Sequence, residues 1–232
     1  MAERQWLQAY VLHRRPYRET SYIVDCFTLE LGKVSAVAKG VRNSRSDRKS
    51  LLQPFQALRI QLTGRSELKN LVQAEGERGQ ILLQGTSLFC GLYVNELLNR
   101  VMPAGLVSES LYSHYQKALG ELSAAVDIEL TLRRFEFAVL KEMGLLADWT
   151  QEGITGEQVQ AEKWYAYSSE EGIVPALPDI TKNPIPGYAL LAAVAEDWTP
   201  SARKVAKHLN RLALLPLVGD KPLKSRELFV IR

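Results

Sequence analysis

The spacing of apolar residues along the chain changes from a period of two to a period of 3.6 near residue 85. Before that point, short runs alternate apolar and polar residues, as strands with one buried face do. Five such runs are predicted, at residues 6–12, 20–28, 33–38, 58–62 and 68–72. Arg14-Arg15-Pro16 predicts a turn, because proline cannot donate to a strand ladder. Five short strands in this length favour a small closed barrel, and spacing alone does not separate an OB-fold from an SH3-like barrel.

The second part of the chain has the apolar period of helices. Helices are predicted at residues 90–101, 108–122, 127–143, 187–196 and 201–215. Ser108 and Ser201 are suitable N-caps, and Pro103 and Pro216 are expected to end helices. The fold class is therefore α+β multidomain, with a five-stranded barrel domain over residues 1–80 and a mostly α-helical domain over residues 81–232. A small irregular or hairpin insert is expected near residues 145–186, where residues 164–167 and 172–174 read as two short strands.

Charge is segregated along the chain, although the net charge is only +3. Residues 1–80 carry 14 Lys/Arg against 8 Asp/Glu, residues 81–202 carry 7 against 16, and residues 203–232 carry 8 against 2. These balances of +6, −9 and +6 suggest that particular faces meet a polyanion, while an unevenly charged solvated surface explains the same numbers. No run approaches the ~18 apolar residues of a membrane helix, and the start does not resemble a signal peptide. The chain is expected in the cytoplasm, associated with the nucleoid.

The sequence gives little indication of a catalytic site or a metal site. Only two cysteines are present, Cys26 and Cys90, which excludes a disulfide framework and a four-thiolate metal site. No dinucleotide fingerprint, Walker A motif or HExxH motif occurs, and the carboxylates form no pair suited to acid–base work. We expect no enzyme activity, no cofactor and no metal.

A basic loop is the most informative feature of the first domain. The loop contains one acidic residue, Asp47, and five cations, which are Lys39, Arg42, Arg45, Arg48 and Lys49. Lys33 precedes the loop, and Arg14, Arg15 and Arg18 lie in an earlier loop that barrel closure would bring alongside it. Such clusters bind phosphates by counterion release, without reading sequence. Tyr17 is the best candidate to stack on a base, whereas Tyr22 and Phe55 suit the barrel core.

Two helix faces carry weaker signals. Lys204, Lys207 and Arg211 follow a helical spacing opposite an apolar stripe, which suggests a second phosphate contact or an ordinary solvated face. A second face, in the helix at residues 127–143, mixes cations with apolar side chains and would suit a peptide with an apolar, carboxylate end, or be an ordinary flank with Phe137 in the core. Its members are Leu130, Arg133, Arg134, Phe137 and Lys141, and the first four are the predicted contacts.

Several stretches of the chain resemble the RecO family of bacterial DNA repair proteins. They are residues 11–21, 37–40, 91–98, 132–136 and 219–229, in this order. The resemblance implies an N-terminal OB-fold and a C-terminal helical domain. It also implies binding of single- and double-stranded DNA, annealing of complementary strands and, with RecR, loading of RecA onto DNA coated by the single-stranded-DNA-binding protein (SSB).

The same resemblance makes the basic loop the leading DNA contact. It makes the face around Arg133 a candidate dock for the acidic, phenylalanine-terminated tail of SSB, because a guanidinium suits a carboxylate. Some family members bind zinc through four cysteines, and residues 145–186 contain none. Three alternatives stay open: an adaptor recruited by SSB that binds no DNA, an RNA-binding OB-fold protein, and an enzyme with an unrecognised site in residues 145–186.

Overall fold

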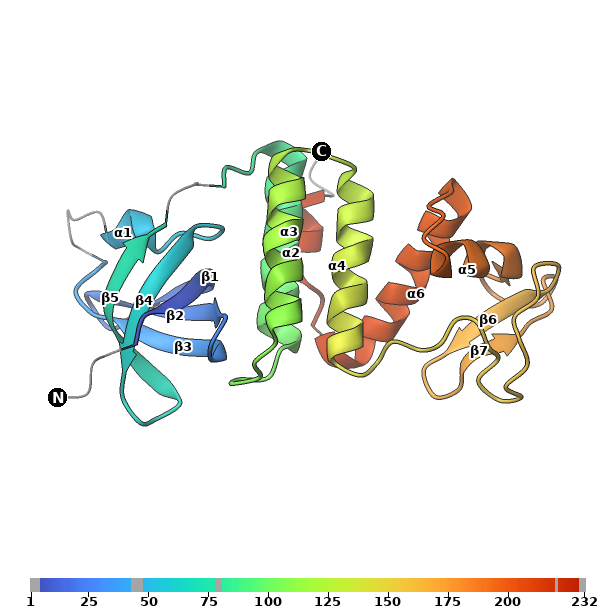
Figure 1. The fold of residues 1–232 in the computed structure, drawn as a ribbon, viewed down its shortest axis with the longest axis horizontal. Coiled ribbons are helices and arrows are strands. Elements are labelled where there is room, and N and C mark those ends of the chain that lie inside the picture. The colour runs from blue at the N-terminus through green and yellow to red at the C-terminus, as the bar shows by residue number, and fades with distance from the viewer. Residues whose placement is uncertain (1–4, 43–47, 78–80, 220, 230–232) are drawn as a thin grey trace. The chain divides into compact units, whose positions relative to one another are not determined.

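The computed structural model describes residues 5–42, 48–77, 81–219 and 221–229, which are coloured along the chain in Figure 1. The chain forms two compact units. Unit 1 is Met1–Ile128 with Lys221–Arg232, and unit 2 is Glu129–Asp220. The helices after residue 80 are thus shared between the two units, so compact packing does not follow the predicted boundary, which stays a prediction.

The first part of unit 1 is a closed five-stranded barrel, shown in blue to teal in Figure 1. Its strands are β1 (Leu7–Tyr17), β2 (Ser21–Thr28), β3 (Gly32–Ala38), β4 (Ala57–Thr63) and β5 (Leu68–Gly76), with the short helix α1 (Arg48–Leu51) before β4. The order is β1-β2-β3-β5-β4, and β1 pairs with β4 to close the barrel. Among the five described barrel strands, β3 and β5 are the pair that runs in parallel. This is the OB-fold that the family resemblance implied, and it settles the choice that strand spacing left open between an OB-fold and an SH3-like barrel.

The predicted turn at Arg14-Arg15-Pro16 is wrong, because β1 continues through it to Tyr17. Pro16 lies opposite Tyr22 of β2, while the pairing of β1 with β4 stops at Tyr10. Beyond Tyr10, β1 therefore has only one neighbouring strand. A proline is tolerated where its missing N–H would have faced away from the ladder.

The barrel is filled by the alternating apolar residues of its strands. Four of the five strands contribute fully buried side chains to this core, and β5 contributes the half-buried Leu71 and Ala74. The buried residues are Leu7, Ala9, Val11, Val24, Cys26, Ala36, Ala38, Val41, Leu52, Leu58 and Ile60. Burial raises the pKa of the Cys26 thiol to about 12, so this cysteine is an inert packing residue.

Two helices cover part of the outer surface of the barrel. They are α2 (Gly85–Val101) and α3 (Glu109–Ser123), and Ser108 caps α3 by accepting from Leu111 N at 3.1 Å, as predicted. Tyr10 and Phe27 point outward from β1 and β2, and both rings meet Tyr112 and Tyr115 of α3 at centroid distances of 5.1–5.8 Å. The aromatic contacts place α3 in the barrel unit, and α2 packs against both β1 and α3.

The C-terminal segment returns to unit 1. The 3-10 helix η1 (Lys224–Phe229) packs against α2, where the Glu96 carboxylate accepts from Lys224 N at 3.0 Å and Ser225 N at 2.8 Å. Arg100 donates to the Lys221 carbonyl at 2.7 Å. Side-chain and backbone contacts therefore hold this segment on one face of the helix.

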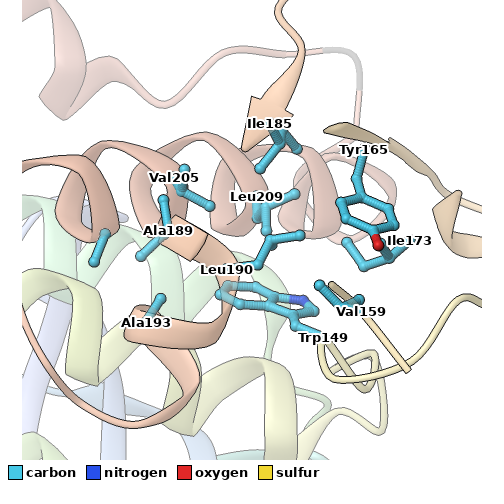
Figure 2. Close-up of a cluster of buried hydrophobic side chains, with 12 residues drawn as sticks. Trp149, Val159, Tyr165, Ile173, Ile185, Ala189, Leu190, Ala193, Val205 and Leu209 are labelled. Carbon is cyan, nitrogen blue, oxygen red and sulfur yellow. The ribbon is translucent and has the colours of Figure 1, made fainter. Parts of the chain in front are cut away.

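Unit 2 combines helices with a small antiparallel sheet. Its elements are α4 (Ile128–Glu142, from its second residue on), β6 (Trp164–Ser168), β7 (Gly172–Pro175), β8 (Ile185–Pro186), α5 (Gly187–Val194) and α6 (Pro200–Val218). The predicted hairpin is present as β6 and β7, and β8 pairs with the other edge of β6. Figure 2 shows the core of this unit, in which Trp149, Tyr165 and Ile173 meet Leu190 and Leu209.

Two details of α6 differ from the sequence prediction. Its N-cap is Thr199, whose Oγ1 accepts from Ala202 N at 3.2 Å, and Pro200 occupies the first helical turn. Proline favours that position because the first N–H groups of a helix have no intrahelical partner. Pro216 lies inside the helix, close to its end, instead of ending it. No helix in the described ranges is long and apolar enough to cross a membrane.

Candidate nucleic-acid interface

A hollow of about 670 Å³ opens at one end of the barrel. It lies between the β1–β2 turn, the end of β3 and the start of β5, and its lining residues are Tyr17, Arg18, Glu19, Thr20, Ser21, Val37, Lys39, Leu68, Lys69 and Asn70. The parallel pairing of β3 with β5 places Val37 opposite Asn70, which brings Lys69 to the end of the barrel where Lys39 lies. The β1–β2 and β4–β5 loops flank the site at which OB-folds bind oligonucleotides.

The lining of the hollow is cationic on balance. The lining contains three cationic side chains, Arg18, Lys39 and Lys69, and one carboxylate, that of Glu19. Lys69 Nζ donates to the Gly64 carbonyl at 3.2 Å, which holds its ammonium near the β4–β5 loop. Excess positive charge around a concave surface attracts phosphate and raises its local concentration.

Arg42 ties the basic loop to the β1–β2 turn. Its backbone N–H donates to the Thr20 carbonyl at 2.9 Å, and its guanidinium reaches the Arg18 carbonyl at 3.4 Å. Arg18 has a backbone φ of 52°, in the left-handed region that few residues with a side chain adopt. These contacts fix the start of the predicted DNA-binding loop beside the hollow.

Tyr17 is the aromatic side chain of this site. It is half-buried in the wall of the hollow, and the Arg18 guanidinium carbon lies 5.2 Å from its ring centroid. Tyr22 packs against the barrel core, as the sequence predicted. Phe55 is buried beside Gly91 of α2 and is not part of the barrel core cluster. A base stacked on Tyr17 would also lie within reach of the guanidinium plane, a combination that suits single strands.

Three predicted phosphate ligands have partners within unit 1. Arg14 donates to the carbonyls of Lys49 and Leu52 at 3.0 and 3.2 Å, at the end of α1. Arg15 donates to the buried carboxylate of Asp25 at 2.9 Å.

Lys33 is the third of these residues. Its Nζ donates to the Asn99 carbonyl at 2.8 Å. Burial lowers the pKa of Lys33, and the nearby Asp25 carboxylate opposes that shift. Lys33 is thereby a structural contact between barrel and helix, which the sequence did not suggest.

The structure describes the side chains of only some of the other predicted loop residues. Lys39, Arg42 and Lys49 are exposed to solvent. Arg45 lies outside the described residues, and Arg48 is described only as the first residue of α1. DNA contact by this group stays a prediction.

The sequence analysis missed Lys69, although it placed Arg18 in the loop expected beside the basic loop, and both residues line the hollow. The alternating pattern of β5 does not distinguish Lys69 from other outward residues. Only the strand order β3-β5 shows that Lys69 belongs beside Lys39.

The basic stripe of α6 lies in unit 2. Lys204 and Arg211 are exposed, and Lys207 forms an ion pair with Glu129 at 3.4 Å. Burial and the nearby Arg211 lower the pKa of His208. The stripe stands opposite the buried side chains of Val205 and Leu209, so its orientation agrees with the predicted amphipathic helix.

The predicted peptide-binding face of α4 is largely internal to unit 2. Arg133 is only 4% exposed, and its Nη1 pairs with Glu136 Oε2 at 2.6 Å. Asn210 Nδ2 of α6 donates to the same carboxylate oxygen at 3.1 Å. Because Arg133 and Glu136 are one helical turn apart, each neutralises the other before any ligand arrives. Arg133 is therefore not presented to an incoming carboxylate, contrary to the expectation.

Other members of that face differ in how far they are exposed to solvent. Phe137 packs on Trp149 and Trp198, with ring centroids 4.9 and 6.2 Å apart. Arg134 stays half-exposed and lies 3.7 Å from the Glu196 carboxylate, a solvent-facing pair of small energetic weight. Leu130 is half-buried. Arg134 and Lys141, which is exposed, are the cations of this face that a ligand can reach.

Across the described ranges, no group of three or more His, Cys, Asp and Glu side chains is arranged to hold a metal ion.

The family models and the similar proteins all indicate the same family. The family model "Recombination protein O N terminal" matches residues 1–79, and "Recombination protein O C terminal" matches residues 82–227. A DNA repair protein RecO of Alteromonas mediterranea is 55% identical over 229 residues, covering 98% of each chain. Those of Pseudoalteromonas atlantica and Haemophilus influenzae are 46% and 44% identical, over 96% of this chain and 93% and 94% of theirs.

Proposed function

This chain belongs to the RecO family of DNA repair proteins, and on that premise we propose that it binds single- and double-stranded DNA and anneals complementary strands. The single observation that carries the proposal is the basic hollow of the OB-fold, where Arg18, Lys39 and Lys69 surround the half-buried ring of Tyr17. The hollow offers phosphate contacts and a stacking surface in one place, which single-stranded DNA uses together.

Annealing follows from charge without covalent chemistry. Two DNA strands repel each other through their phosphates, and cations that contact both strands lower this repulsion. The hollow would hold one strand, while the exposed cations of the loop (Lys39, Arg42 and Lys49) and of α6 (Lys204 and Arg211) are available to a second strand or to duplex. Phosphate contacts position a strand without reading it, so base pairing selects the partner. The protein would act in the cytoplasm, and the proposed role needs no active site.

The wider role is assembly on DNA coated by SSB. We propose that the chain is recruited by the SSB tail and, together with RecR, helps to load RecA. On α4, Arg134 and Leu130 are reachable groups for the terminal carboxylate and ring of that tail, whereas Arg133 is paired with Glu136. Arg134 can present two N–H donors to a carboxylate.

The test is an annealing assay with complementary oligonucleotides, on bare strands and on strands coated with SSB. The hollow variant Lys39→Glu/Lys69→Glu is compared with Arg59→Glu, which makes the same type of charge change on β4, where Arg59 stacks on Trp6 instead of lining the hollow. We expect the hollow variant to lose annealing of bare strands by more than about tenfold, from loss of phosphate contacts. The Arg59→Glu protein should remain within about twofold of wild type by the same argument.

The alternatives predict other outcomes. An adaptor that binds no DNA would bind the SSB tail and show no affinity for bare strands. An RNA-binding OB-fold protein would prefer a single-stranded RNA to the DNA of the same sequence, since only RNA carries the 2′-hydroxyl. Equal loss of annealing in the Arg59→Glu control would contradict the placement of DNA in the hollow.

A further inference from the structure

The three-stranded sheet of unit 2 is mostly apolar on both faces. Its inner face carries Tyr165, Ile173 and Ile185, all buried in the core of Figure 2. Side chains alternate along a strand, so the outer face carries the intervening residues, which are Trp164, Ala166, Ser168, Gly172, Val174 and Pro186. The register sets Trp164 beside Pro186 and Ala166 beside Val174. An antiparallel sheet with one buried face usually has polar residues on the other, whereas Ser168 is the one polar side chain on this outer face within β6, β7 and β8.

The turn after β7 enlarges the apolar surface. Ala176 N donates to the Trp164 carbonyl at 2.9 Å, which ties the start of this turn to β6. Leu177 and Ile180 follow with 65% and 79% of their surface exposed, and Trp164 is 39% exposed. Ile180 is the most exposed large hydrophobic residue in the described part of the chain. We call Trp164, Val174, Leu177 and Ile180 the sheet patch. Trp164, Leu177 and Ile180 are exposed, Val174 is half-buried, and the turn is tied through its backbone to the strand that carries Trp164. Exposed apolar groups close to one another mark interaction surfaces.

The surroundings of the sheet patch are acidic. Residues 145–186 hold seven acids and two lysines, a balance of 2 − 7 = −5. Apart from buried Glu152, these acids are exposed: Asp148, Glu157, Glu162, Glu170, Glu171 and Asp179. Phosphate-bearing partners, both nucleic acid and anionic membrane, are repelled by such a surface. The occupant must therefore be apolar and cationic.

A second copy of this chain presents a surface of that chemistry. Residues 1–80 have a charge balance of 14 − 8 = +6. The hollow of the barrel combines the apolar side chains of Val37 and Leu68 with the cations of Arg18, Lys39 and Lys69. In the turn that carries Leu177 and Ile180, Asp179 stands between the two apolar side chains. The turn thus presents apolar groups and a negative charge to a hollow that presents apolar groups and positive charges.

We propose that the sheet patch of one copy binds the barrel hollow of a second copy. The contact is head-to-tail, since different surfaces of the two copies meet, and such a contact can add further copies. The inference rests on the exposure and charge of two surfaces and does not depend on DNA binding. It assigns an occupant to the apolar face of the sheet, which belongs to neither of the candidate sites above.

The test is sedimentation velocity of the full chain without DNA. Wild type is expected to sediment faster as its concentration rises towards about 100 μM, the range of weak specific complexes. The association should weaken between about 0.05 M and 0.5 M salt, because screening acts on the opposite charges. Wild type that stays monomeric across this range would overturn the proposal.

Three variants locate the contact. The patch variant is Leu177→Ser/Ile180→Ser, and the hollow variant is Lys39→Glu/Lys69→Glu. The control is Leu215→Ser, which changes an apolar residue of α6 that is 54% exposed and lies outside the sheet. Both test variants should raise the dissociation constant more than about tenfold, from lost apolar burial or reversed charge, while the control leaves it unchanged. Thermal unfolding shows that each variant is folded.

Mixing the patch variant with the hollow variant distinguishes a head-to-tail contact from a contact between two sheet patches. Each lacks one half of a head-to-tail contact and retains the other, so a mixture of patch variant and hollow variant should form a heterodimer that neither forms alone. If the hollow variant self-associates like wild type, the sheet patch binds another sheet patch or a different surface, and the proposal is wrong. A patch variant that associates like wild type overturns it equally.

Discussion

Tyr115 Oη donates to Asn95 Oδ1 at 2.7 Å, and the amide of Asn95 donates in turn to the backbone carbonyls of Val11 and Leu12. Asn95 thereby joins α3, α2 and β1 through one buried side chain. Its two acceptors lie where the register of β1 with β2 shifts, between Val11 and His13. A local irregularity of the barrel is thus satisfied by a helix that follows the barrel in the chain.

We predict that Asn95→Leu lowers the free energy of unfolding by about 2–4 kcal/mol, because two buried carbonyls and a phenol lose their partner. Urea unfolding measures the loss. Tyr115→Phe is the matched control and should cost about 1 kcal/mol, since it removes one of these hydrogen bonds. Equal stability of Asn95→Leu and wild type would show that the amide does not link barrel and helices.

Binding to single-stranded DNA should depend steeply on salt. If about six phosphates are neutralised, log affinity falls with log salt at a slope of about −4. Lys69→Ala should reduce the magnitude of this slope by about 0.7, the share of one contact. Lys33→Ala is the control and should leave the slope unchanged, because Lys33 Nζ donates to the Asn99 carbonyl. Fluorescence anisotropy over a salt series measures both, and a slope near zero for wild type contradicts the phosphate contacts.

The buried Arg133–Glu136 pair should contribute to stability more than to ligand binding. Glu136→Leu leaves the Arg133 guanidinium buried without its carboxylate, and it should cost about 3–5 kcal/mol of unfolding free energy. The double change Arg133→Met/Glu136→Leu removes both charges and should recover most of that loss. Chemical unfolding of the single and double variants checks the pair.

A peptide with the sequence of the SSB tail separates the role of Arg134 from that of Arg133. Arg134→Ala should weaken binding of this peptide by about tenfold, the weight of a hydrogen-bonded charge at a partly exposed site. The double variant Arg133→Met/Glu136→Leu should bind it as wild type does. The reverse result in calorimetry would return Arg133 to the binding site.

The attachment of the C-terminal segment to α2 should weaken in acid. Burial acts to raise the pKa of Glu96, but the N–H groups of Ser225 and Lys224 and the nearby Arg100 outweigh it and lower this pKa below its ordinary 4.5. A carboxyl whose folded pKa is depressed stabilises the fold above its ordinary pKa, and this contribution is lost as the pH falls through the folded value. The stability difference between wild type and Glu96→Gln should therefore be full at pH 6 and shrink below about pH 4, as measured by thermal unfolding. A constant difference would exclude ionised Glu96 as the anchor.

Much of the fold follows from local patterns in the sequence. Alternation over residues 20–28 and 33–38 predicts β2 and β3, because a period of two places apolar residues on one face of a strand. Ser108 predicts the start of α3, because its hydroxyl can accept an N–H that the helix leaves unpaired. The basic composition of residues 39–49 likewise indicates a phosphate-binding loop. These signals depend only on neighbours along the chain, so no tertiary contact is needed to interpret them.

What the sequence left undecided depends on contacts between distant segments. Pro16 continues a strand because β4 ends its pairing with β1 at Tyr10, and Lys69 joins the hollow because β5 pairs in parallel with β3. Arg133 becomes buried because α6 supplies Asn210 beside Glu136. The sequence by itself determined the strands, the helices and the separation of charge, since these follow from residue type and period. Only the tertiary structure decided which cations stay free to bind a ligand, because the partner that neutralises a side chain can come from anywhere in the chain.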